Sequence, residues 1–197
     1  MSQQPIERHA PPERLFHWTM AASVIICLAT AFLPILGFEF DWVDPHWIAG
    51  VVLILAIIFH LWRVFFRLEL KEMSVTKTDL TDLKAIIDPT LKSDETDRKY
   101  DLGQKLYHLA TAALIISLCL TGGLMLAKLD TWFWDRIPGI LSDAQWGIVY
   151  TVHGATALCL IMMFILHLYF SFLPEHRQLL IAMASGNPNL KKGTHNE

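Results

Sequence analysis

Two pairs of histidines in this sequence have a spacing that could place metal ligands at two depths of a membrane. His46 and His60 are 14 residues apart, and so are His153 and His167. On one helix this spacing returns the second side chain to nearly the same face. At about 1.5 Å per residue it also separates the two side chains by roughly 21 Å along the axis. Two helices that each carry an imidazole near each membrane surface would suit two haem groups stacked across the bilayer.

The elements that must position these histidines are long apolar segments. The chain has 197 residues, of which 53% are hydrophobic and 18% charged, and this apolar share exceeds that of ordinary soluble domains. A run of about 20 apolar residues can cross a bilayer as a helix, and four runs are present, at about 15–37, 46–66, 106–127 and 147–173. We therefore predict an all-α integral membrane four-helix bundle over residues 14–175, with flanking segments 1–13 and 176–197 and a connector at 67–105.

The positive charges indicate how these helices are oriented. If the spans alternate in direction, all of the 16 Lys and Arg residues except Lys128 and Arg136 fall on one side of the membrane. The positive-inside rule then places both termini and the connector 67–105 in the cytoplasm of a bacterial inner membrane. Apolar residues at helical spacing between 80 and 91 predict a short amphipathic helix in this connector. The polar tail 186–197 is predicted to be disordered.

Only two of the span histidines lie on the periplasmic side in this orientation, His46 and His153. Each lies close in sequence to a glycine, Gly50 or Gly154, that would let a flat macrocycle approach the helix backbone. Because bis-imidazole ligation needs two histidines and this level offers two, we expect this pair to bind one haem iron.

Four histidines lie on the cytoplasmic side, where one iron can take only two: His17, His60, His108 and His167. His167 is favoured by its spacing from His153. Symmetry with His46 argues for His60 as its partner, but spacing alone leaves His17 and His60 both open. For His108, the alternatives are a quinone pocket, a haem propionate or a backbone carbonyl.

Other chemistry for these residues is less well supported by the sequence. The three cysteines, Cys27, Cys119 and Cys159, stand singly within apolar runs, so the chain has no CxxC or CxxCH motif for an iron–sulfur cluster or covalent haem. Histidines in a membrane can also relay protons in a transporter or channel, and the chain could be a passive anchor. Two b haems per chain in a visible spectrum would exclude both alternatives.

Four stretches carry a resemblance to a known family: RLFHWT at 14–19, DPHWIAGVV at 44–52, KYDLGQK at 99–105 and VHGATALCLIMMFILHLYFSF at 152–172. They resemble the gamma subunit, a cytochrome b, of respiratory formate dehydrogenase. They cover all four spans in order, and the KY-x-x-GQK stretch is the most specific of them. The span histidines by themselves are shared with the cytochrome b subunits of nickel–iron hydrogenase and thiosulfate reductase.

The resemblance implies haem ligands for this chain. His17 and His167 would bind the cytoplasmic-side haem b, and His46 and His153 would bind the periplasmic-side haem b. This implication favours His17 over His60 as the partner of His167, against the symmetry argument.

The resemblance also implies a quinone site beside the cytoplasmic-side haem. Menaquinone or ubiquinone would contact Asp101, Gly103, Gln104 and His167, and Asp101 could donate a proton to the reduced quinone. The electrons would come from an iron–sulfur beta subunit and a molybdenum or tungsten catalytic alpha subunit, because this chain has no donor-oxidising site of its own. The alternative within this reading is the cytochrome b subunit of a hydrogenase or thiosulfate reductase complex.

Overall fold

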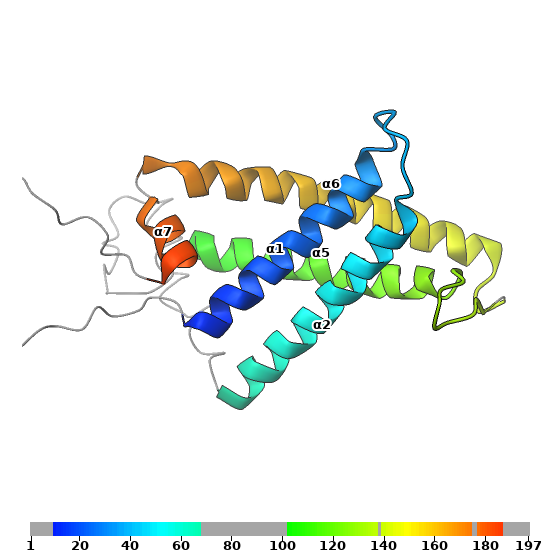
Figure 1. The fold of residues 1–197 in the computed structure, drawn as a ribbon, viewed down its shortest axis with the longest axis horizontal. Helices are drawn as coiled ribbons and strands as arrows, with labels where there is room; N and C mark the ends of the chain where they lie inside the picture. The colour runs from blue at the N-terminus through cyan, green and yellow to red at the C-terminus, as the bar shows by residue number, and fades with distance from the viewer. Residues whose placement is uncertain (1–9, 68–101, 138, 175–176, 187–197) are drawn as a thin grey trace, which may run out of the picture. The chain divides into compact units, whose positions relative to one another are not determined.

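The structure, a computed structural model, describes residues 10–67, 102–137, 139–174 and 177–186. In this part of the chain the elements are five α-helices, and no strand is present apart from one isolated bridge in a turn. Four helices are long and apolar enough to span a membrane: α1 (Pro11–Phe32), α2 (Val43–Arg67), α5 (Leu102–Leu126) and α6 (Asp143–Phe172). Figure 1 labels them along the chain. The predicted all-α class with four spans is confirmed.

The long helices begin three or four residues before the apolar runs from which they were predicted. Their first turns contain residues that do not belong to those runs, such as Pro11 in α1, Asp44 in α2 and Asp143 in α6. The first N–H groups of a helix have no intrahelical acceptor, so proline costs nothing there and a carboxylate is favoured by the helix dipole. Hydropathy therefore found the membrane-crossing part of each helix and missed its polar first turn.

Helix α1 ends at Phe32, five residues earlier than the apolar run predicted. Pro34 has no N–H to continue the helix, and the chain turns back through a hydrogen bond from the Leu36 amide to the Phe32 carbonyl at 3.2 Å. Gly37 follows with φ +92°, a left-handed conformation that glycine adopts without strain. The apolar residues after Phe32 thus belong to a turn.

Many large apolar side chains point away from the rest of the chain on the long helices. Leu55 of α2 is 60% exposed, Leu120 of α5 67% and Met162 of α6 66%. A water-soluble protein would not expose apolar residues along whole helices, whereas in a bilayer they contact lipid at no cost.

The contacts divide the chain into two compact units. The first unit is Met1–Ala56 with Leu158–Glu197, and the second is Ile57–Ala157. The first unit therefore contains α1, the beginning of α2, the end of α6 and a short helix, α7 (Arg177–Ser185). The second unit contains the end of α2, α5, the following connector and the beginning of α6.

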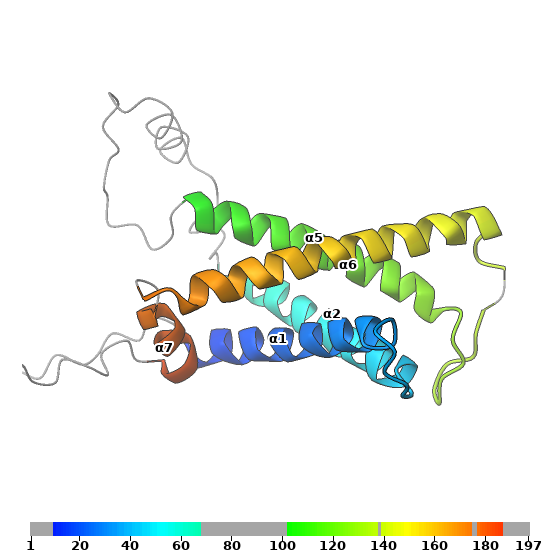
Figure 2. The same cartoon turned by 90° about the horizontal axis from the view of Figure 1, so that it is seen from above.

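Helix α7 lies in the flanking segment 176–197, for which no helix was predicted, and it ends just before the predicted polar tail 186–197. It lies beside the start of α1, as both views show (Figures 1 and 2). The Arg14 guanidinium donates to the Ala184 carbonyl at 2.7 Å, and the Trp18 indole N–H donates to the Met183 carbonyl at 3.3 Å. These donors satisfy carbonyls of the last turn, which have no intrahelical partner. Because the partners are about 170 residues away in sequence, no local pattern could reveal this contact between α7 and α1.

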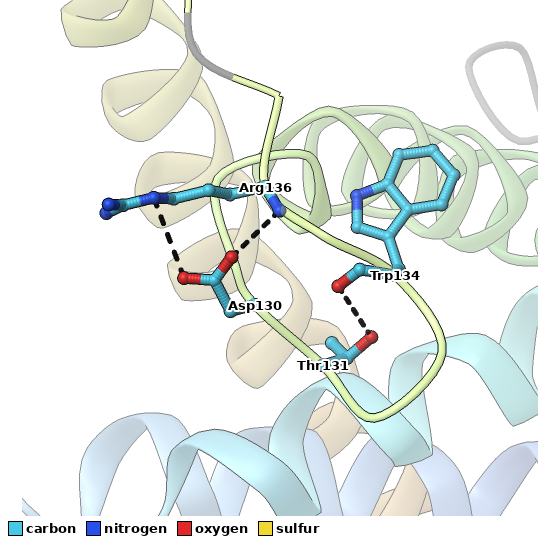
Figure 3. Close-up of polar contacts among 4 residues, drawn as sticks. All are labelled: Asp130, Thr131, Trp134 and Arg136. Atoms are coloured by element: carbon cyan, nitrogen blue, oxygen red, sulfur yellow. Dashed lines mark hydrogen bonds and ion pairs between the residues drawn. The ribbon is translucent and has the colours of Figure 1, made fainter.

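The connector between α5 and α6, in the second unit, contains a tight turn at Thr131–Trp134 (Figure 3). Asp130 closes the base of this turn: its carboxylate accepts from the Arg136 backbone N–H at 2.9 Å and lies 3.6 Å from the Arg136 Nε. Trp132 at the tip is 86% exposed.

Some predictions fall outside the described residues. They are the terminal segment 1–9, the amphipathic helix predicted near 80–91, Asp101 of the quinone site, and the tail beyond residue 186. The placement of both termini in the cytoplasm stays a prediction.

Candidate cofactor-binding site

The structure brings two of the predicted ligands together in the first unit. His17 lies in the second turn of α1 and His167 lies near the end of α6, and their ring centroids are 6.2 Å apart with the planes tilted by 48°. Trp18 contacts the His17 ring edge-on at 5.3 Å between centroids. Since Trp18 also donates to α7, the residue next to His17 is held at this end of the unit.

The distance between these two rings suits a metal ion held between them. A metal–nitrogen bond to imidazole is about 2 Å, and a ring nitrogen lies about 1.1 Å from the ring centre, so two imidazoles facing each other across one metal have centroids about 6 Å apart. No group of three or more His, Cys, Asp or Glu side chains that could hold a metal occurs among the described residues. A four-ligand protein site such as those of zinc is therefore not formed there. Two imidazoles do suffice for haem, because the porphyrin supplies the other four nitrogens.

His46, also in the first unit, is oriented by a threonine. The Thr30 hydroxyl of α1 lies 2.9 Å from the His46 Nδ1, and the His46 carbonyl accepts from the Cys27 thiol at 3.6 Å. Thr30 is buried, with 5% of its surface exposed. Helix α1 therefore fixes both the ring and the backbone of His46 at the start of α2.

His153, in the second unit, has the same arrangement around its ring. The Thr121 hydroxyl of α5 lies 2.8 Å from the His153 Nδ1. The next residue, Gly122, leaves room for the imidazole, because a Cβ at this position would lie 3.3 Å from the His153 Cε1. A larger residue at 122 would press on the ring. Gly122 and Thr121 together therefore fix the position of the His153 imidazole.

Sequence reasoning missed Thr30, Thr121 and Gly122. It pointed to Gly50 and Gly154, where an added Cβ would meet no described atom within 4 Å. The available signal was a hydroxyl residue inside an apolar run, in ATAF at 29–32 and LTGG at 120–123. That signal is weak, because threonines in membrane helices often bond only to their own backbone.

The other predicted histidine ligands are divided between the two units. His46 belongs to the first unit and His153 to the second, so their pairing at one haem stays a prediction. His60 in α2 and His108 in α5 belong to the second unit, and the choice of His60 as a partner for His167 is likewise untested.

The predicted quinone residues are only partly described. Gly103 and Gln104 lie in the first turn of α5, whereas Asp101 is outside the described residues. The predicted contact of these residues with a quinone and with His167 stays a prediction.

Comparison with known proteins gives one family. The family model of prokaryotic cytochrome b561 matches residues 8–186, which is nearly the whole chain and includes the five helices of the described residues. No curated protein matches the sequence. With four apolar helices, the family identifies a multi-pass protein of the bacterial inner membrane. The chain belongs to the prokaryotic cytochrome b561 family, and it is a membrane-bound b-type cytochrome that binds haem b and functions in electron transfer.

Proposed function

We propose that this chain is the dihaem cytochrome b subunit of a respiratory formate dehydrogenase. In this proposal electrons enter from an iron–sulfur subunit on the periplasmic side and leave to a quinone near the cytoplasmic face. The observation that carries the haem-binding part is the 6.2 Å separation of the His17 and His167 rings on α1 and α6, which suits one haem. The second haem rests on the resemblance and on the presence of His46 and His153. The formate dehydrogenase part rests on the resemblance of the four stretches, above all KYDLGQK at 99–105.

Each proposed ligand has a defined part in holding a haem. His17 and His167 hold the cytoplasmic-side haem between α1 and α6, and the contact of Trp18 with His17 restricts that ring. His46 and His153 hold the periplasmic-side haem, each with its Nδ1 against a threonine hydroxyl. Haem iron, when bound, supplies reversible one-electron transfer, and a low-dielectric protein surrounding sets its potential.

The quinone would bind near the start of α5. Gly103 would leave space for the ring, Gln104 would offer a hydrogen bond to a quinone oxygen, and Asp101 would supply a proton. Electrons that move inward to this site against a positive-outside potential cost about 2.3 kcal/mol per charge per 100 mV, so quinone reduction with cytoplasmic protons would contribute to the proton motive force. Quinone-reduction rates of Asp101→Asn test the proton transfer, because an unchanged rate would remove that role from Asp101.

The ligand assignment is tested by haem content. We expect His17→Ala and His167→Ala each to lose one of two b haems, whereas His60→Ala keeps both. The haem-to-protein ratio of purified variants, measured as the pyridine haemochrome, separates these outcomes. Loss of a haem in His60→Ala with both haems kept in His17→Ala would transfer the ligand role to His60.

The physiological donor is tested by partners and by reduction. We expect the tagged chain to co-purify with an iron–sulfur subunit and a molybdenum or tungsten subunit, and formate to reduce its haems in membranes. If hydrogen reduced the haems and a nickel–iron subunit co-purified, the chain would instead serve a hydrogenase. A thiosulfate reductase subunit in the complex would likewise replace formate dehydrogenase, and in both cases the dihaem electron-transfer role would stand.

A further inference from the structure

Two threonines on different helices contact histidine Nδ1 atoms in the same way. Thr30 of α1 lies 2.9 Å from Nδ1 of His46, and Thr121 of α5 lies 2.8 Å from Nδ1 of His153. The two contacts lie in different units and involve different helices. The same contact between a threonine hydroxyl and a histidine Nδ1 therefore occurs twice, at the two histidines predicted from the sequence to lie on the periplasmic side.

Each threonine hydroxyl donates its only proton to a backbone carbonyl of its own helix. Thr30 Oγ1 lies 2.7 Å from the Ile26 carbonyl and 3.1 Å from the Cys27 carbonyl. Thr121 Oγ1 lies 2.7 Å from the Ser117 carbonyl and 3.2 Å from the Leu118 carbonyl. A carbonyl oxygen can only accept, so the hydroxyl donates to the backbone one turn earlier.

The remaining contact of each hydroxyl fixes the tautomer of the histidine. With its proton given to the backbone, the threonine oxygen can only accept from Nδ1, so Nδ1 carries the ring proton. In a neutral imidazole the lone pair then lies on Nε2, the nitrogen that would face an iron. A hydrogen bond from the other ring nitrogen also fixes the plane of a metal-bound imidazole and makes it a stronger electron donor to the metal.

We propose that Thr30 and Thr121 are positioning residues for the periplasmic-side haem, which present His46 and His153 as Nδ1-protonated imidazoles. This inference rests on the proposed function, which assigns those two histidines to one haem. With haem bound, the two hydroxyls would strengthen the electron donation of His46 and His153 to its iron. They would therefore stabilise the oxidised form and lower the midpoint potential relative to a haem whose ligands lack such acceptors.

The experiment replaces each hydroxyl without changing the side-chain shape. Thr30→Val and Thr121→Val remove the acceptor, and Thr30→Ser and Thr121→Ser restore it. Thr151→Val is the matched control, because the Thr151 hydroxyl donates to the Gly147 carbonyl at 2.8 Å in the same way and is exposed on the same helix as His153. The readouts are the haem-to-protein ratio, the potentiometric titration of each haem, and the low-spin EPR signals of the oxidised protein.

We expect both valine variants to raise the midpoint potential of one and the same haem and to shift its EPR signal. At a fixed electrode potential near its midpoint, the ratio of reduced to oxidised haem should rise by at least about threefold. The serine variants and Thr151→Val should titrate like the wild type. Loss of that haem in the valine variants, with retention in the serine variants, would support the same conclusion.

Three other results would overturn the inference. Valine variants that titrate like Thr151→Val would show that the hydroxyls do not act on the haem, while two haems in the wild type would keep the proposed function. Serine variants as altered as the valine variants would show a packing role only. Fewer than two b haems in the wild type would overturn the proposed function itself, and the inference with it.

Discussion

Gly122→Ala tests directly how closely the structure confines the His153 imidazole. The added Cβ would lie 3.3 Å from the His153 Cε1, whereas two carbon atoms reach their optimal separation at about 3.5–4.0 Å. The ring must therefore retreat by about 0.2–0.7 Å. Its hydrogen bond to Thr121 starts at 2.8 Å between Oγ1 and Nδ1, and such a displacement can stretch this bond to or beyond its usual limit of about 3.2 Å.

The expected result is a weaker hold on one haem only. Overpacking of this kind costs about 1–3 kcal/mol, which would weaken retention of the haem proposed for His153 by about five- to 150-fold if the whole cost falls on the loaded protein. We expect a lower haem-to-protein ratio and a shifted low-spin EPR signal for that haem, with the haem proposed for His17 and His167 unchanged. The assay is the pyridine haemochrome together with EPR on purified protein.

Gly123→Ala is the matched control, because a Cβ at that position would meet nothing of this chain within 4 Å. Both variants gain the same helix propensity, so a difference between them isolates the contact with His153. If Gly122→Ala retained both haems with the spectra of Gly123→Ala, the reasoning from the 3.3 Å contact would be refuted.

Two further predictions concern parts of the chain away from the histidine rings. Trp18→Phe removes the donor to the Met183 carbonyl. Protease should therefore digest α7 about fivefold faster, as expected for loss of one hydrogen bond of about 1 kcal/mol. Equal digestion rates in Trp18→Phe and in the control Leu15→Ala would contradict this prediction. Asp130→Ala should open the turn of Figure 3 and speed chymotryptic cleavage there. Arg136→Gln should change the cleavage rate little, because the backbone N–H of residue 136 still donates to Asp130 and an exposed ion pair contributes only about 0.2–1 kcal/mol. Equally fast cleavage in Asp130→Ala and Arg136→Gln would show that the ion pair holds the turn.

Local sequence was enough to predict the four spans. Each apolar run is long enough to cross a bilayer, and in lipid a backbone must satisfy its hydrogen bonds within its own segment, which leaves the helix as the structure for a single span. The ends of the helices were less predictable, because Pro11, Asp44 and Asp143 are polar or restricted residues that are nevertheless favourable in a first turn.

The sequence by itself determined that this is an all-α membrane protein with histidines at two depths, since composition and the 14-residue spacing follow from the order of residues alone. Only the tertiary structure decided that His17 of α1 lies 6.2 Å from His167 of α6 between ring centroids, and that the Thr30 and Thr121 hydroxyls lie within hydrogen-bond distance of His46 and His153. It also decided that α7 is held by Arg14 and Trp18. The physical reason is that each of these contacts joins different helices, and the rotation of one helix against another is set by packing between side chains far apart in the chain, which no local period encodes.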